Sequence, residues 1–209
     1  MNEARNTPGI TIKINAPEAM NGNTEMWIQI FSEFAGILRH LESIDVDNDK
    51  DLFIEDNEIM LTPGYHTVRL NFHEDYRPES LRSLFASCKD IEEIRFENID
   101  TSEVTDMSSM IAWCDKLKKV EGCEDWNTGN VTSLWALCCS CYNLEDISFL
   151  RKWDTSKVED IDDMLTQCFK LKTLEPILDW NIERIEYRNG FEGIDENIRR
   201  DMMRKLSMM

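Results

Sequence analysis

Two groups of side chains in this sequence could bind a metal ion or take part in a reaction: the cysteines and a run of acids. The seven cysteines include the close set Cys138, Cys139 and Cys141, which has the residue types of a zinc or redox site. No second cysteine pair stands at the spacing of a zinc site, however, and Cys141 belongs to a series that repeats along the chain. We therefore expect the cysteines to be small core residues and predict no metal site.

The acidic run near residue 50 has carboxylates at every second position, as at the start of a calcium-binding loop. In such a loop the sixth position needs a glycine and the twelfth a bidentate glutamate, but here they are Lys50 and Asp56. We interpret the run as a solvated turn and as an acidic patch that could meet a basic partner. The patch consists of Asp45, Asp47, Asp49, Asp51, Glu55, Asp56 and Glu58.

Residues for nucleophilic or acid–base catalysis are not grouped in this sequence. The three histidines, His40, His66 and His73, are isolated, and no HExxH or Gly-x-Ser-x-Gly pattern occurs. The eight glycines form no phosphate-binding loop. We therefore predict that the chain is not an enzyme and needs no cofactor.

The net charge of −18 is large for 209 residues. It opposes direct binding to nucleic acid, because phosphate contacts come from lysine and arginine, and it suits a protein partner with a basic surface. No apolar run of 18 residues is present, and the N-terminus lacks the basic-then-apolar order of a secretory signal. We expect a cytoplasmic protein without a membrane span. The identity of the partner and the oligomeric state stay open.

The cysteine series marks an internal repeat. Cys88, Cys114, Cys141 and Cys168 are separated by 26, 27 and 27 residues. Before each cysteine, apolar residues three and four apart predict a short helix. After each cysteine comes a phrase close to the LxxLxL of leucine-rich repeats, which predicts a short strand. Trp126, Trp153 and Trp180 recur with the same period and predict an apolar ladder.

Three regions follow from these patterns. Residues 1–77 are predicted to form an α+β N-terminal capping unit with a strand at 10–14, an amphipathic helix at 24–41 and short strands at 52–54, 58–61 and 68–72. Residues 78–185 are predicted to form the repeats, and residues 186–209 a C-terminal capping helix. The predicted fold class is α/β: a short leucine-rich-repeat solenoid of about four 26–27-residue repeats with these two caps.

The repeat phrases resemble those of a known family. DTSEVTDMSSMIAWCDKLKKV and its echoes WNTGNVTSLWALCCSCYNL and WDTSKVEDIDDMLTQCFKL are similar to the turn, helix, cysteine and leucine strand of the BspA-like bacterial leucine-rich-repeat proteins. The resemblance covers about half the chain. It implies a right-handed solenoid used for protein contacts, with the bacterial surface as the alternative location to the cytoplasm.

A contact surface is predicted on the strand face of the repeats, because the residues that flank the second leucine of each phrase point away from the core. These residues are Glu93, Arg95, Lys119, Glu121, Asp146, Ser148, Thr173 and Glu175. We predict a non-catalytic protein–protein interaction module that binds through this face. One alternative is a small acidic intracellular inhibitor, of phage or bacterial origin, that mimics nucleic acid. A second alternative, from the resemblance, is a surface adhesin.

Overall fold

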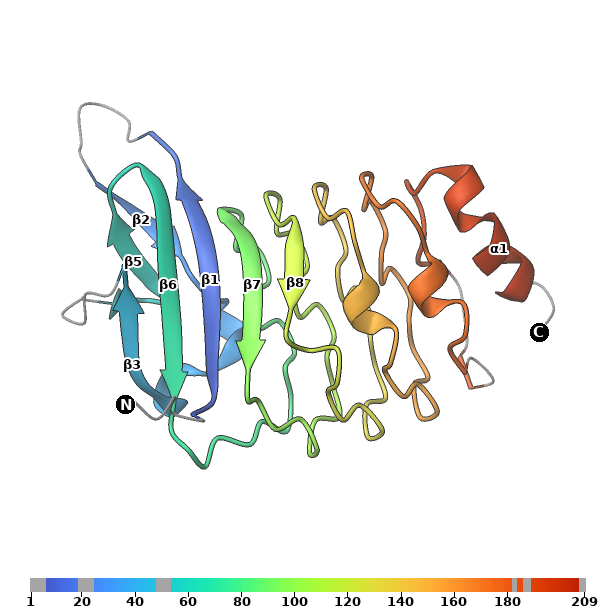
Figure 1. Ribbon diagram of the computed structural model, residues 1–209, viewed down its shortest axis with the longest axis horizontal. Coiled ribbons are helices and arrows are strands. Elements are labelled where there is room, and N and C mark those ends of the chain that lie inside the picture. Colours follow the sequence, from blue (N-terminus) through green and yellow to red (C-terminus); the bar gives the residue numbers. More distant parts are fainter. Residues whose placement is uncertain (1–6, 19–24, 48–53, 182–183, 186–188, 207–209) are drawn as a thin grey trace, which may run out of the picture.

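The computed structural model (Figure 1) describes residues 7–18, 25–47, 54–181, 184–185 and 189–206. These residues are mostly β structure and turns. A five-stranded sheet has the order β3-β6-β1-β7-β8, and a three-stranded sheet has the order β2-β5-β4. The strands are β1 Gly9–Ala16, β2 Met26–Gln29, β3 Leu41–Val46, β4 Ile54–Glu55, β5 Glu58–Leu61, β6 Gly64–Phe72, β7 Ile91–Glu97 and β8 Lys119–Glu121.

Strand β1 lies at the centre of the five-stranded sheet. Its alternating sequence buries Ile10, Ile12 and Ile14, each at most 2% exposed, against the core. β1 pairs antiparallel with β6 on one side and with β7 on the other, so that Ile12 stands opposite Val68 and Ile94. The sheet therefore runs without a break from the N-terminal strands into the first repeat, and the predicted domain boundaries stay predictions.

The predicted helix at 24–41 was wrong. The chain forms strand β2, paired antiparallel with β5, and then two short 3-10 helices, η2 Glu33–Ala35 and η3 Leu38–His40. Ile28 and Ile30 are both buried, which is the two-residue period of a strand. Gly36 then adopts a left-handed conformation with φ of +62°, which an α-helix does not contain. The apolar residues of this segment fit both periods, so their spacing alone did not decide between helix and strand.

The short helices predicted before each cysteine were also wrong. Residues 81–88 and their counterparts in the other three repeats form consecutive turns, with two residues at positive φ in each. The eight left-handed residues are Ser83, Ser87, Ser109, Trp113, Ala136, Ser140, Asp163 and Gln167. A helix needs negative φ throughout, so two left-handed residues four positions apart in each segment exclude it and leave a series of turns.

The turn segments hold one another through the main chain. Every second N–H group bonds to the residue three before it in its own segment, as Leu84 does to Leu81 at 3.2 Å. The N–H groups between them donate to the next segment at 2.8–2.9 Å: Leu81 to Asp106, Ser83 to Ser108, Phe85 to Met110 and Ser87 to Ala112. The same pattern links the later segments, where Asp106, Ser133 and Asp160 mark successive parallel bridges. Each segment is therefore completed by its neighbour.

Among the described residues of the repeats, the predicted strand forms only as β7 and β8, which pair in parallel. The third and fourth repeats form 3-10 helices there, η4 Ser148–Leu150 and η5 Glu175–Ile177. At η4, the Asp146 carboxylate accepts the Ser148 N–H at 2.9 Å, which favours a turn. At η5, Pro176 has no N–H to donate to a neighbouring strand. The predicted α/β leucine-rich-repeat solenoid was thus wrong: the described residues are mostly β, with one α-helix.

That α-helix is α1 Glu196–Leu206, at the C-terminal end of the stacked segments in Figure 1. It lies within the predicted C-terminal helix, and Ile194 and Met202 are buried against the last segments. Among the described residues, no helix combines the length and apolar character that crossing a bilayer requires.

Candidate functional site

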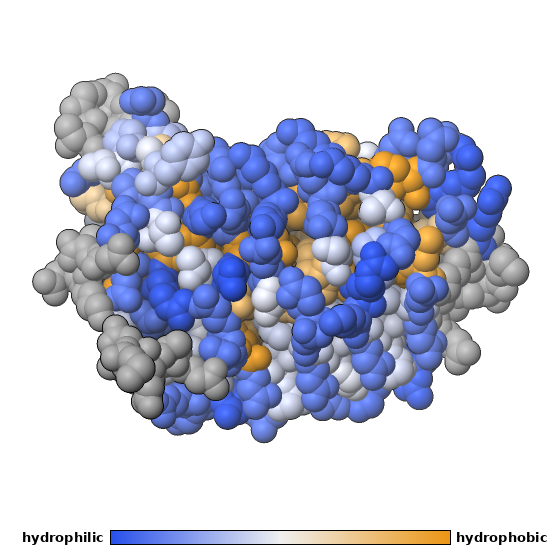
Figure 2. Space-filling model, viewed as in Figure 1, coloured by the Kyte–Doolittle hydropathy of each residue, from blue (hydrophilic) through white to orange (hydrophobic). Residues whose placement is uncertain are grey.

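The side chains predicted for the strand face do lie on adjacent segments. Glu93 and Arg95 of β7 stand directly beside Lys119 and Glu121 of β8. Asp146 and Ser148 precede or begin η4, and Thr173 and Glu175 hold the same place at η5. We call these eight residues the platform; each is exposed or half-buried. Figure 1 shows β7, β8 and the two 3-10 helices side by side, and Figure 2 shows the mainly hydrophilic surface of that view.

Most platform charges are paired within the protein. Lys13 of β1 contacts Glu93 at 2.6 Å, and Lys119 contacts Glu121 at 2.6 Å. The hydrogen bond from Lys119 lowers the pKa of Glu121, and the bond from Arg151 lowers the pKa of Glu175. Exposed pairs of this kind contribute little to stability, roughly 0–1 kcal/mol each. They can therefore exchange partners at low cost, and the platform presents both signs of charge.

The predicted acidic patch is divided between the two sheets. Asp45 and Asp47 lie at β3, Glu55 and Glu58 lie on β4 and β5, and Asp56 lies in the turn between them. Asp49 and Asp51 lie outside the described residues.

The two acids at β3 already have partners inside the protein. Asp45 accepts a hydrogen bond from Asn71 at 3.0 Å. Asp47 accepts the Thr67 N–H at 2.8 Å and contacts the His66 ring at 2.7 Å. Burial raises the pKa of Asp47, but these two contacts outweigh it and leave the pKa below its usual value. The described acids of this run therefore do not form one continuous surface of free carboxylates.

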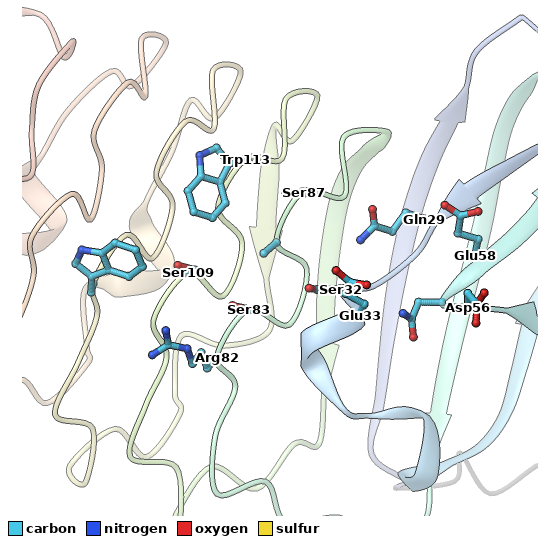
Figure 3. Close-up of a pocket in the computed structure, with 13 residues that line it drawn as sticks. Gln29, Ser32, Glu33, Asp56, Glu58, Arg82, Ser83, Ser87, Ser109 and Trp113 are labelled. Atoms are coloured by element: carbon cyan, nitrogen blue, oxygen red, sulfur yellow. The ribbon is translucent and has the colours of Figure 1, made fainter.

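A groove of about 670 Å³ lies between the three-stranded sheet and the turn segments (Figure 3). One wall comes from β2, β5, the turn between β4 and β5 and the start of η2, and the other from three successive turn segments. The lining residues on the first side are Gln29, Ser32, Glu33, Asp56, Asn57 and Glu58. Those on the second side are Arg82, Ser83, Ala86, Ser87, Ser109, Trp113 and Trp135.

The two walls of the groove differ in chemistry. The first carries three carboxylates, from Glu33, Asp56 and Glu58, and the second carries serine hydroxyls and two indole rings. Arg82 is the single cationic side chain among the described lining residues, and its contact with Asp106 is long, at 3.4 Å. The groove therefore presents mainly hydrogen-bond acceptors and aromatic surface.

The cysteines occupy the core and not a site. Six of the seven are buried, and Cys139 is half-buried. Burial raises the pKa of every one of these thiols, that of Cys168 to about 12, so none is activated as a thiolate at neutral pH. Within the described residues, no three side chains of His, Cys, Asp or Glu are grouped so as to hold a metal ion.

Sequence reasoning found two groove residues, Asp56 and Glu58, as part of the acidic run, and missed the rest. One signal could have found more of them. Trp113 occupies the slot that Ser87, Ser140 and Gln167 fill in the other repeats, and Trp135 likewise occupies a slot that is polar elsewhere. These tryptophans do not belong to the 27-residue tryptophan ladder, so the repeat gives no structural reason for them.

The fold and the groove together define a mostly β protein in which segments of 26–27 residues stack on an N-terminal pair of sheets. Residues 79–200 match the family described as "Mycoplasma protein of unknown function, DUF285". The match covers more than half of the chain, and the chain belongs to this family. No curated protein and no solved structure matches it.

The family match corrects the resemblance drawn from the repeat phrases. The matched region contains all four repeats, yet the family is DUF285 and not the BspA-like leucine-rich-repeat family. In this chain the phrases consist of turn residues, a small buried cysteine and buried leucines at short intervals. These are requirements of packing, and they do not carry a function from one family to another.

Proposed function

We propose that this chain is a non-catalytic protein-interaction module that binds a protein partner through the platform. The observation that carries the proposal is the alignment of polar side chains of both signs along β7, β8, η4 and η5. Charges arranged in this way favour a partner with a complementary pattern and determine its register more than its affinity.

The alternative of a nucleic-acid mimic has less support. Such a mimic would need its carboxylates free to meet a basic surface. Asp45 and Asp47 are instead hydrogen-bonded within the five-stranded sheet, and Glu55, Asp56 and Glu58 lie on the other sheet. The negative charge of −18 still favours partners with basic patches, which the platform proposal accommodates.

The proposal is tested by charge reversal on the platform. A partner is first captured on the immobilised chain from an extract of the organism that encodes it, then purified and titrated by calorimetry. The variant R95E/K119E should weaken binding by about tenfold or more, since reversed charges meet like charges on the partner. The variant K157E/K170E changes the net charge equally at exposed lysines outside the platform and should bind normally. Equal loss in both variants would exclude the platform as the contact.

A further inference from the structure

A serine hydroxyl without a described protein partner opens into the groove. Ser109 is only 3% exposed, yet its side chain lines the groove and makes no hydrogen bond to any described residue (Figure 3). Its neighbour Ser108, also buried, bonds to the Ser133 hydroxyl at 2.8 Å. Buried polar groups in native proteins are paired with protein, water or ligand. The hydroxyl of Ser109 is accessible from the groove and unpaired within the described residues, so it can bond to water or to a polar ligand there.

The main chain also presents free acceptors to the groove. In the later turn segments, the carbonyls of alternate residues accept N–H groups from the preceding segment. In the first segment the equivalent carbonyls include those of Arg82, Leu84 and Ala86, and there is no preceding turn segment. The Ser32 N–H donates a hydrogen bond to the carbonyl of Leu84 at 3.0 Å. Those of Arg82 and Ala86 have no partner among the described residues, and both residues line the groove.

Two indole rings complete the second wall. Trp113 is 38% exposed and Trp135 is half-buried, and neither ring contacts another aromatic ring of the described chain. Their N–H groups also lack partners there, whereas the ladder residues Trp153 and Trp180 donate to main-chain carbonyls at 2.9 and 3.1 Å. These two indole faces are available to a ligand. A cation above an indole face is attracted by the negative face of the ring.

We propose that this groove binds an extended peptide segment containing arginine, separately from the platform. The guanidinium stacks on Trp113 or Trp135 and pairs with the carboxylates of Glu33, Asp56 and Glu58 on the facing wall. Arginine fits better than lysine because it is planar and carries five N–H donors, which matches a groove rich in acceptors. A peptide fits better than a small polyamine because its main-chain N–H groups can reach the free carbonyls of the open edge.

Arg82 supplies an internal check on this proposal. Its side chain is 60% exposed, lies at the groove and, among the described residues, pairs only with Asp106, at 3.4 Å. It carries the same charge as the proposed ligand and therefore opposes it. Removing this side chain should strengthen binding, which loss of structure could not do. Arg82→Ala is thus a variant whose expected effect has the opposite sign to that of the other groove variants.

The probe is a fluorescein-labelled peptide of four Gly-Arg units, titrated by fluorescence anisotropy at low and at raised salt, beside Gly-Lys and Gly-Glu peptides of equal length. We expect the arginine peptide to bind severalfold more tightly than the lysine peptide, and the glutamate peptide not to bind. Trp113→Ala should weaken the arginine peptide about five- to thirtyfold. D56N/E58Q should weaken it about three- to tenfold at low salt, and Arg82→Ala should tighten it.

Matched variants separate the groove from bulk charge. E103Q/D179N removes two exposed acids that do not line the groove, and Tyr65→Ala removes an aromatic ring that is 77% exposed on β6. Both should bind the arginine peptide like the parent protein. The proposal is overturned if these controls lose as much affinity as the groove variants, or if arginine and lysine peptides bind equally and Trp113→Ala has no effect. Displacement of the peptide by equimolar spermine would overturn the choice of a peptide.

Discussion

The cysteine series, Cys88, Cys114, Cys141 and Cys168, which we call the ladder cysteines, shows why cysteine recurs at the end of each turn segment. The thiol of Cys114 donates to the carbonyl of Phe85 at 3.1 Å, that of Cys141 to Ile111 at 2.9 Å and that of Cys168 to Cys138 at 3.1 Å. A thiol is small enough for the core and still donates a weak hydrogen bond. These core positions therefore need a small side chain that donates a hydrogen bond, and the reactivity of the thiol does not explain why cysteine is found there.

This arrangement predicts the reactivity of the thiols. Native protein treated with iodoacetamide at pH 8 should take up one adduct, at Cys139, because the other six cysteines are buried and burial raises their pKa values. Even Cys139 should react slowly, since partial burial raises its pKa as well. Intact-mass spectrometry counts the adducts, and unfolding in urea should release all seven sites. Rapid native labelling of a ladder cysteine would contradict the buried ladder.

Aspartates at the start of turns stabilise the fold because their charged carboxylates accept main-chain N–H groups. The Asp154 carboxylate accepts the Ser156 N–H at 2.9 Å, and this bond is the main reason that its pKa lies below the usual value. A lowered folded-state pKa stabilises the fold above the unfolded pKa, near 3.8, and this contribution disappears as pH falls through the lower folded value.

We expect Asp154→Asn to be slightly less stable than the parent protein at pH 6, because a neutral amide accepts the Ser156 N–H less strongly than a carboxylate does. The difference should shrink as pH falls from 4 to 2.5. Urea unfolding followed by circular dichroism at each pH measures it. Asp179→Asn is the control, since Asp179 begins no such turn among the described residues, and a pH-independent difference for Asp154→Asn would refute the assignment.

At the scale of elements, the sequence predicted positions better than conformations. The strand at 58–61 was found with the same bounds, and the helical spacing near residues 194–206 gave α1. The repeat segments were misassigned because their apolar spacing fits a helix, while the hydrogen bonds that decide the matter run to residues 25 or more positions away. The spacing of apolar residues alone cannot reveal hydrogen bonds between segments that are distant in the sequence.

The groove was hidden for a related reason. Its two walls are about 50 residues apart in sequence at Asp56 and Ser109, and only the folding of β2, β4 and β5 beside the first turn segment brings them together. The local signals that did exist were the acidic run and two tryptophans outside the ladder period. Neither signal specifies which distant segment will face it.

The turn directly after β8 depends on glycine at position 122. The φ of Gly122, +80°, favours glycine, and a Cβ there would lie 2.0 Å from the carbonyl oxygen of Phe96 on β7. Because that oxygen belongs to a paired strand, it cannot move away easily. Gly122→Ala should lower the free energy of unfolding by at least about 1–3 kcal/mol.

Urea denaturation provides the measurement for Gly122→Ala. Gly129→Ala serves as the matched control, because its added Cβ would meet only side-chain atoms, the nearest being Asp154 Oδ2 at 3.2 Å, and its φ is not in the left-handed region. We expect that variant to unfold within about 0.5 kcal/mol of the parent protein. Similar stability of both variants would show that the β8 turn tolerates a side chain.

At the scale of the whole molecule, the chain behaves as a series of segments that complete one another. The N-terminal strands continue into β7 through β1, and the Ser32 N–H reaches the first turn segment. At the other end, Asn189, Gly190 and Glu192 accept N–H groups from the fourth segment before α1 begins. Stability in such a series is roughly a sum of segment and interface contributions.

A deletion in register tests this directly. Removing residues 105–131 joins Val104 to Thr132, recreates the native Val-Thr step and brings Ser133 beside Ser80, as Asp106 is now. The main-chain ladder can then re-form between 81–88 and 134–141, so the shortened protein should still unfold cooperatively, with a lower urea midpoint because one interface is lost. Removing residues 105–130 instead shifts the register by one, which places Ser133, Ala136 and Ser140 where Leu134, Leu137 and Cys141 belong in the core. That protein should show no cooperative transition by circular dichroism, and equal behaviour of the two deletions would refute a register set by the ladder.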